Sequence, residues 1–264
     1  MHDLSLPLSE ELPAHWATHM PFQAKIYNWF DREETRDGHL FSRCGPYYTR
    51  WLLLDEHTGT HFDAPSHFVP PPGSDLPHSG SPGAVTASHV PVRQFMGKAA
   101  VIDVPYRRGF DEVPVGESYE FGPDVVAGWE AENGTLTSDH IVLFRTGWDE
   151  KYQAGHAGSA YTHDVLVTKT APGWPAPDTD CISLLLSRGI GCAGTDGASM
   201  GSAHNGQPVH VLGLSSGMVF IEALGNLGSL PVDGAYFVFL PIKVDGGSGA
   251  PGRAIAFVPG FGTD

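Results

Sequence analysis

Short apolar runs rich in β-branched and aromatic residues recur along the chain, and segments rich in Gly and Pro separate them. Short runs of this composition between turn-forming segments are typical of strands with a buried face. A chain with many such strands must bury them against one another, so we expect a large sheet to be its main element. The sequence predicts strands at residues 49–54, 99–104, 140–146, 189–195, 218–224, 235–244 and 253–258.

Two helices are predicted between these strands. One begins near Pro123, because Pro suits the first helical turn, and ends at the Asn133-Gly134 pair. The other begins near Asp178 and ends at Gly189. Their apolar faces are formed by Val125, Val126 and Trp129 in the first helix and by Ile182, Leu185 and Leu186 in the second. Because strands outnumber helices, we expect an α/β or α+β domain built on a curved, mixed sheet.

Length and charge limit the class of protein. A chain of 264 residues without a linker or repeat predicts a single domain over residues 1–264. Thirty acidic against fifteen basic residues give a formal charge of -15, so we expect neither nucleic acid nor an anionic membrane as partner. The N-terminal residues lack the features of a signal peptide, which predicts a cytoplasmic protein. Three dispersed cysteines predict reduced thiols, not a disulfide framework: Cys44, Cys181 and Cys192.

One segment concentrates metal-binding side chains. The stretch "HTGTHFDAPSHF" holds three histidines and an aspartate, at His57, His61, Asp63 and His67. All four have odd numbers, so in an extended chain they would point to the same side. A helix fits less well, because Asp63 would lie about 200° around the axis from His61. Imidazoles with a carboxylate suit Zn(II), Mn(II) or Fe(II), so the segment predicts a metal site.

Further ligands are expected from a distant part of the chain. Glu222 is the only charged residue of the predicted strand 218–224. A buried carboxylate needs a cationic partner, and no Lys or Arg occurs between Arg188 and Lys243. Glu222 is therefore a candidate metal ligand. His210 is a second candidate, and composition alone leaves His204 as its competitor.

The pattern H-x-G-T-H-x-D-x-P-x-H, which runs from His57 to His67, resembles the signature of the cyclase family of metal-dependent hydrolases. That family includes bacterial kynurenine formamidase, isatin hydrolase and trans-dienelactone hydrolase. Further matches are "DLSLPLS" near the start, "AAVIDV", "LFRTGW" (143–148), "GTD" (194–196) and "FIEALGNLGSLP" (220–231). The resemblance implies a swivelling β/β/α domain that assembles into a homodimer or homotetramer and acts on a small molecule.

The resemblance also implies a site with one or two Zn²⁺ or Mn²⁺ ions. In the formamidase branch, one ion would be held by His57, His61 and Asp63. Asp63 and Glu222 would bridge to a second ion, held by His210, whose 12-residue spacing from Glu222 resembles the closing pair of that branch. His67 would stay unligated and serve as the catalytic acid and base.

The substrate pocket is predicted to be apolar and partly aromatic. Trp16 resembles a pocket tryptophan of the formamidases, and Phe62, Phe68 and the Pro-rich residues 69–77 are expected to join it. The segment 69–92 is longer than in compact formamidases and is expected to form a pocket wall or lid. Such a pocket favours a small, flat, neutral substrate.

The resulting hypothesis is a hydrolase that cleaves a small cyclic or aryl-linked amide or ester with a metal-activated water. Two alternatives stay open on the sequence. One is a non-haem iron oxygenase with a two-histidine, one-carboxylate site, which leaves His57, His67 and Glu222 without roles. The other is a metal-binding protein without catalytic activity.

Overall fold

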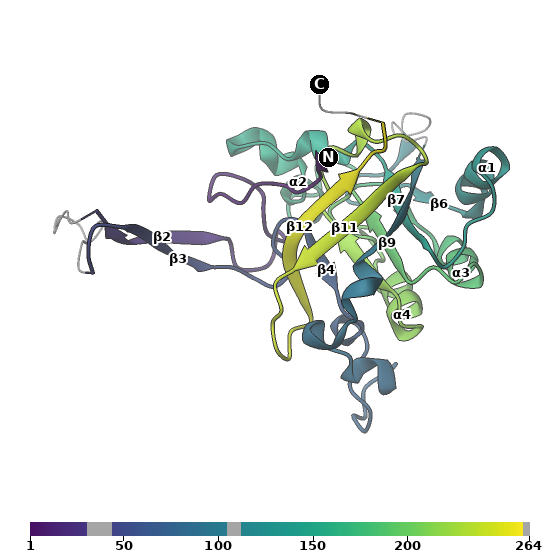
Figure 1. Ribbon diagram of the computed structural model, residues 1–264, viewed down its shortest axis with the longest axis horizontal. Helices are drawn as coiled ribbons and strands as arrows, with labels where there is room; N and C mark the ends of the chain where they lie inside the picture. Colours follow the sequence, from purple (N-terminus) through teal and green to yellow (C-terminus); the bar gives the residue numbers. More distant parts are fainter. Residues whose placement is uncertain (31–43, 105–111, 261–264) are drawn as a thin grey trace.

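The main element is a closed, mixed β-sheet. A computed structural model describes residues 1–30, 44–104 and 112–260. In the described residues the strands follow the order β1-β12-β11-β5-β7-β9-β10-β4, and β4 also pairs with β12, which closes the sheet into a barrel (Figure 1). Its strands are β1 (His2–Asp3), β4 (His61–Asp63), β5 (Met96–Asp103), β7 (His140–Arg145), β9 (Cys192–Thr195), β10 (Val219–Glu222), β11 (Ala235–Pro241) and β12 (Gly249–Phe257).

Strand direction divides the barrel into two halves. Strands β5, β7, β9 and β10 run parallel to one another, whereas the pairings β10–β4, β4–β12, β12–β11 and β11–β5 are antiparallel. Side chains alternate between the two faces, so that Ala99 and Val101 of β5 join the interior cluster. Ala100 and Ile102 face outward and join a second apolar cluster beneath the helices. This arrangement confirms the expected α/β fold with a curved, mixed sheet.

Three helices pack on the parallel half of the barrel: α1 (Pro123–Asn133), α3 (Thr179–Ser187) and α4 (Gln207–Ser215). Helices α1 and α3 are those predicted from the sequence. The Asp178 side chain caps α3 by accepting a hydrogen bond from the backbone N–H of Cys181 (2.7 Å). Helix α4 was not predicted, because its nine residues include Pro and Gly and its apolar positions do not follow a clear helical period. A short helix, α2 (His163–Leu166), lies near the N-terminal segment (Figure 1).

A hairpin projects from the barrel as a separate two-stranded sheet (Figure 1). It consists of β2 (Gln23–Trp29) and β3 (Tyr48–Leu53), which pair only with each other in the described residues. The predicted strand 49–54 is therefore a strand, but it belongs to this hairpin and most of its side chains are exposed. The other six predicted strands all lie in the barrel. A third sheet pairs the short strands β6 (Glu120–Phe121) and β8 (Ala176–Pro177).

Among the described residues, none of the helices is long and apolar enough to cross a membrane.

Candidate metal centre

The centre is built where β4 meets β10 on the outer face of the barrel. The antiparallel register places His61 opposite Glu222, so their side chains leave the sheet on the same face. Within the three residues of β4, His61 and Asp63 share this outer face. The predicted common orientation is therefore found for His61 and Asp63. The strand does not include His57 or His67, so the prediction does not hold for these two histidines. His57 precedes β4 in a turn, and His67 ends a 3₁₀ turn formed by Pro65–His67.

Two imidazoles are aimed at the centre by backbone carbonyls. The Nδ1 atoms of His61 and His210 lie 2.8 Å from the carbonyl oxygens of Gly59 and Gly206, respectively. An Nδ1–H that donates to a carbonyl leaves Nε2 unprotonated and free to bind a cation. Nε2 of His210 lies 3.1 Å from Glu222 Oε1 and 3.4 Å from Asp63 Oδ2. Helix α4, which carries His210, therefore brings a distant histidine to the strand ligands.

Two buried carboxylates form the anionic part of the centre. Asp63 and Glu222 are both almost inaccessible to solvent. In the described part of the chain, their ion-pair partners are all imidazoles. Glu222 Oε1 accepts hydrogen bonds from the Ser199 hydroxyl (3.1 Å) and the Met200 backbone N–H (2.6 Å). Asp63 Oδ2, in contrast, is buried and accepts no hydrogen bond. A buried carboxylate oxygen without a donor is the kind of atom that a metal ion satisfies.

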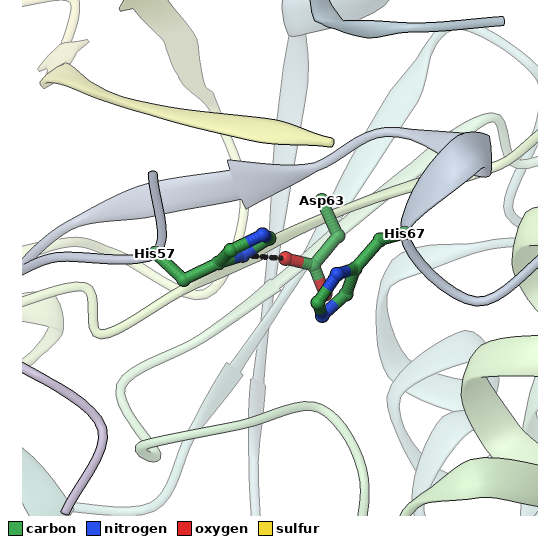
Figure 2. Close-up of side chains that lie close together, drawn as sticks. All are labelled: His57, Asp63 and His67. Atoms are coloured by element: carbon green, nitrogen blue, oxygen red, sulfur yellow. Dashed lines mark hydrogen bonds and ion pairs between the residues drawn. The ribbon is translucent and has the colours of Figure 1, made fainter. Parts of the chain in front are cut away.

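His57 and His67 lie beside Asp63 (Figure 2). His57 Nδ1 is 2.8 Å from Asp63 Oδ1, and the ring of His67 stacks on that of His57 with centroids 3.9 Å apart. His57 Nε2 is 2.9 Å from the Ser248 hydroxyl, which itself donates to Glu56. Ligand atoms of His57, Asp63 and His67 lie within 4.8 Å of one another, as do those of His61, Asp63 and Glu222. The two groups share Asp63.

The charges of the cluster favour a bound cation. Burial lowers the pKa of His67 to about 4, so this imidazole is neutral near pH 7. Burial also opposes the charged form of His210, but the nearby carboxylates of Asp63 and Glu222 outweigh it and raise the pKa to about 10. The carboxylates thus attract positive charge strongly enough to hold a proton on a buried imidazole. A divalent ion would compete for the same position.

The donor set fits a divalent metal. Imidazole nitrogens and carboxylate oxygens suit Zn²⁺ and Mn²⁺, and Asp63, whose buried Oδ2 accepts no hydrogen bond, belongs to both groups of candidate ligands. The five ligands named from the sequence, His57, His61, Asp63, His210 and Glu222, all meet at this centre. The competitor His204 lies elsewhere, where it accepts a hydrogen bond from the Ser118 backbone N–H.

A cavity of about 210 Å³ opens above the centre. Trp16 and Phe68 line it as predicted, the first in edge contact with Trp174 (5.5 Å) and the second stacked on His210 (4.3 Å). The lining of the cavity includes Trp16, His67, Phe68, Tyr152, Tyr161 and Ser199. The walls are thus largely aromatic, and the polar groups converge at the metal end.

Two expectations about the cavity are wrong. Phe62 does not line it, because its even position in β4 turns the ring into the barrel interior, where it contacts Phe95 and Phe239. The segment 69–92, including the Pro-rich residues 69–77, contributes no lining residue either. It packs instead near the turn before β12, where Ala87 donates a backbone hydrogen bond to Gly247. Residues within 13–19 and 152–162 supply much of the wall, together with Phe68.

The core position of Phe62 leads to a prediction. We expect Phe62→Ala to lower the free energy of unfolding by about 3–5 kcal/mol, the usual cost of removing a buried phenylalanine ring. The variant should bind metal and retain the KM of the parent, since the ring does not reach the cavity. Denaturant unfolding and metal analysis of the folded protein test this. A rise in KM without a loss of stability would instead indicate that the Phe62 side chain lines the cavity.

Two residues that support the centre and its cavity are not predicted from the sequence. Ser199 orients Glu222 and Trp174 supports Trp16, yet neither belongs to a pattern with a metal or catalytic spacing. Asp196, in the "GTD" match, has a structural role: its carboxylate accepts hydrogen bonds from the Thr146 hydroxyl (2.6 Å) and the Gly147 N–H (2.8 Å). The matched segments "LFRTGW" and "GTD" are therefore bound to each other beneath the cavity.

The chain is similar to known proteins over most of its length. A family described as "Putative cyclase" matches residues 2–202. Isatin hydrolase of Roseibium aggregatum is 33% identical over 81% of this chain and 77% of its own length. Kynurenine formamidase of Salinibacter ruber is 27% identical over 77% of each chain. A crystal structure of an isatin hydrolase bound to the product analogue thioisatinate has a TM-score of 0.74 and 26% identity, and the match covers 98% of this chain and 92% of that one.

Proposed function

The chain belongs to the cyclase family, and on this premise we propose that it is a metal-dependent hydrolase of small cyclic or aryl-linked amides. One observation carries the proposal: two oriented imidazoles and two buried carboxylates, one with an orphaned oxygen, converge at the floor of an aromatic cavity. Residues 1–264 would form one such domain, in a cytoplasmic homodimer or homotetramer.

A cyclic amide fused to an aromatic ring is the substrate class that we favour. The similarity to isatin hydrolase exceeds that to kynurenine formamidase in identity, and the fold matches a structure with thioisatinate bound. The cavity suits a flat neutral ring, because its walls are aromatic and its described lining includes no Lys or Arg that would hold a phosphate or carboxylate. An N-formyl aryl amide ranks second and a lactone third.

The metal would be held by His57, His61, Asp63, His210 and Glu222, with Zn²⁺ or Mn²⁺ as one or two ions. When bound, such an ion polarises a carbonyl and makes a water molecule more acidic. The chain's own contribution is to fix the ligands. Gly59 and Gly206 set the tautomers of the two histidines, and Ser199 holds the Glu222 carboxylate in place.

His67 would move the proton. It lines the cavity, lies beside Asp63 without a hydrogen bond to it, and is neutral because burial lowers its pKa to about 4. A neutral imidazole at this position can accept a proton from water as the amide carbonyl is attacked. It then delivers the proton to the departing nitrogen. Trp16 and Phe68 hold the ring of the substrate between them and the metal end.

A panel of substrates tests the proposed class. We expect ring opening of isatin to be the fastest reaction, with slower cleavage of N-formylkynurenine and of dienelactones. Efficient turnover of peptides or phosphoesters, with none of these three, would refute the class. Fe(II)-dependent oxygen uptake would favour the oxygenase alternative, and an inactive protein with bound metal would favour the non-catalytic one.

Trp16→Ala should raise KM more than it lowers kcat, because the indole lines the cavity and does not reach the metal ligands. Its contact with Trp174 makes it a wall of the pocket, so its removal loosens substrate binding. Steady-state kinetics with the best substrate of the panel test this. A fall in kcat with unchanged KM would show that the indole acts on the reaction step.

A further inference from the structure

A hydrogen-bonded chain leads from the metal centre to two side chains outside it. His57 Nε2 lies 2.9 Å from the Ser248 hydroxyl, and that hydroxyl donates to Glu56 Oε2 at 2.8 Å. The same carboxylate oxygen accepts the Ser248 backbone N–H, also at 2.8 Å. Glu56 and Ser248 do not line the cavity and belong to neither group of candidate ligand atoms. The proposed reaction therefore leaves both without a role.

The donor and acceptor roles along this chain can be assigned. A carboxylate only accepts hydrogen bonds, so the single hydroxyl hydrogen of Ser248 points to Glu56. The Ser248 oxygen is then left to accept from His57, which requires a hydrogen on Nε2. A neutral imidazole carries one N–H, so Nδ1 of His57 presents a lone pair. His61 and His210 have the opposite tautomer, because their Nδ1 atoms face backbone carbonyls.

That lone pair faces the Asp63 carboxylate (Figure 2). His57 Nδ1 and Asp63 Oδ1 are 2.8 Å apart, and two lone pairs repel at this distance unless the two atoms share a cation. A proton is one such cation, and a metal ion bound by both atoms is another. We propose that Ser248 and Glu56 are positioning residues that make Nδ1, not Nε2, the metal-binding atom of His57. This inference rests on the proposed metal site.

Two glycines make room for this chain. Gly247 and Gly249 stand on either side of Ser248, and both are buried. A Cβ atom on Gly249 would lie 2.7 Å from His57 Cε1, and one on Gly247 would lie 2.8 Å from Glu56 Oε1. Non-bonded atoms do not approach so closely, so any other residue would displace the imidazole or the carboxylate. The Gly-Ser-Gly sequence therefore fits both partners of the serine.

The turn that carries Ser248 is fixed from two directions. The Ser248 carbonyl accepts the Ala64 N–H at 2.9 Å, directly after β4, and the Gly247 carbonyl accepts the Ala87 N–H at 2.7 Å. Ala87 belongs to the segment 69–92, which contributes no lining residue to the cavity. This segment thus supports the centre indirectly, because it holds the turn that carries the serine.

Zn²⁺ affinity tests the proposal, because it is measured without substrate. Competition with a chelator at fixed pH gives the dissociation constant of the parent and of each variant. We expect Ser248→Ala and Glu56→Ala to weaken Zn²⁺ binding by about 10–100-fold, the usual effect of losing the hydrogen bond behind a ligating histidine. Ser88→Ala is the matched control, since it removes a hydroxyl that donates to Asp245 (3.1 Å) in the same turn, and it should keep the parent affinity.

A double-mutant cycle shows whether Ser248 acts through His57. His57→Ala should weaken Zn²⁺ binding at least as much as Ser248→Ala, and adding Ser248→Ala to it should cost no further affinity. An equal loss in both backgrounds would mean that the serine acts on the fold alone, and an unchanged affinity in Ser248→Ala would exclude it as a positioning residue. If His57→Ala itself binds Zn²⁺ like the parent, the ligand set of the proposed function is wrong.

The tautomer is measured directly on the Zn²⁺-loaded parent, so this test does not depend on a folded variant. Long-range proton–nitrogen NMR spectra distinguish a protonated ring nitrogen from a metal-bound one. We expect His57 to carry its hydrogen on Nε2 and to bind Zn²⁺ through Nδ1, whereas His61 and His210 bind through Nε2. A His57 that binds Zn²⁺ through Nε2 would overturn the proposal.

Discussion

Replacing His61 or Asp63 by alanine should remove both the bound metal and the activity. Asp63 belongs to both groups of ligand atoms at the centre, and its buried Oδ2 atom accepts no hydrogen bond, with His210 Nε2 3.4 Å away. His61 directs Nε2 to Asp63 and Glu222 at 3.6 and 3.5 Å, with its other nitrogen tied to Gly59. Loss of either side chain leaves too few donors to hold an ion against water.

Elemental analysis of the purified variants, together with hydrolysis rates, measures this. The controls are His78→Ala and Asp75→Ala, which remove the same side chains from exposed positions of the segment 69–92. The controls should bind metal and turn over like the parent. Stoichiometric metal in both His61→Ala and Asp63→Ala would mean that the ligand assignment is wrong.

His67→Asn should separate metal binding from catalysis. We expect near-normal metal content and a loss in kcat of about 10²–10⁴, the usual effect of removing a general acid or base. The physical reason is that His67 lines the cavity and carries no hydrogen bond to the carboxylates, and we assign the ligands to five other side chains. Asparagine keeps a polar side chain of similar reach but cannot take up a proton near neutral pH.

The same variant decides between two roles that the geometry allows. Ligand atoms of His57, Asp63 and His67 are close enough to share an ion, which would make His67 a ligand. In that case His67→Asn would lose metal as readily as His61→Ala, and the proton carrier would have to be another group. Metal content measured side by side on the two variants gives the answer.

Most strands and two helices could be predicted because their signals are local. Apolar runs ended by Gly or Pro mark strands such as β5 and β7, and the Pro123 and Asp178 positions mark helix starts. Helix α4 lacks such a signal, since its stability comes from packing of Val209 and Leu214 against the sheet. Barrel closure, made by the pairing of β4 with β12, depends on contacts between residues far apart in sequence.

The candidate ligands could be named because their spacing in the sequence is informative, but the conformation of the segment that carries them could not be predicted. Alternation correctly placed His61 and Asp63 on one face and applied equally to Phe62, which it turns into the barrel. The same rule failed for His57 and His67, because Gly59 and Pro65 end the strand on either side. Phe62 holds the even position of the strand, so its side chain points away from the face that carries His61 and Asp63.

The pocket walls were harder to predict, because they depend on how distant loops meet. The Pro-rich segment 69–77 follows the metal motif directly and is predicted to line the cavity, but it contributes no lining residue. Residues 152–162, which do line the cavity, contain aromatic residues at Tyr152 and Tyr161 without any catalytic pattern. Sequence adjacency to a ligand was therefore a poor guide to adjacency in space.

Ring opening of isatin by protein that has been stripped with a chelator and then supplied with metal tests the central claim most directly. We expect the stripped protein to be inactive and the rate to rise with added Mn²⁺ or Zn²⁺ until one or two ions are bound per chain. With metal supplied, the hydrolysis rate should be highest for the parent, lower for His67→Asn and lowest for Asp63→Ala. Undiminished hydrolysis by the stripped protein would contradict the account, as would metal-loaded protein that leaves isatin, N-formylkynurenine and dienelactones intact.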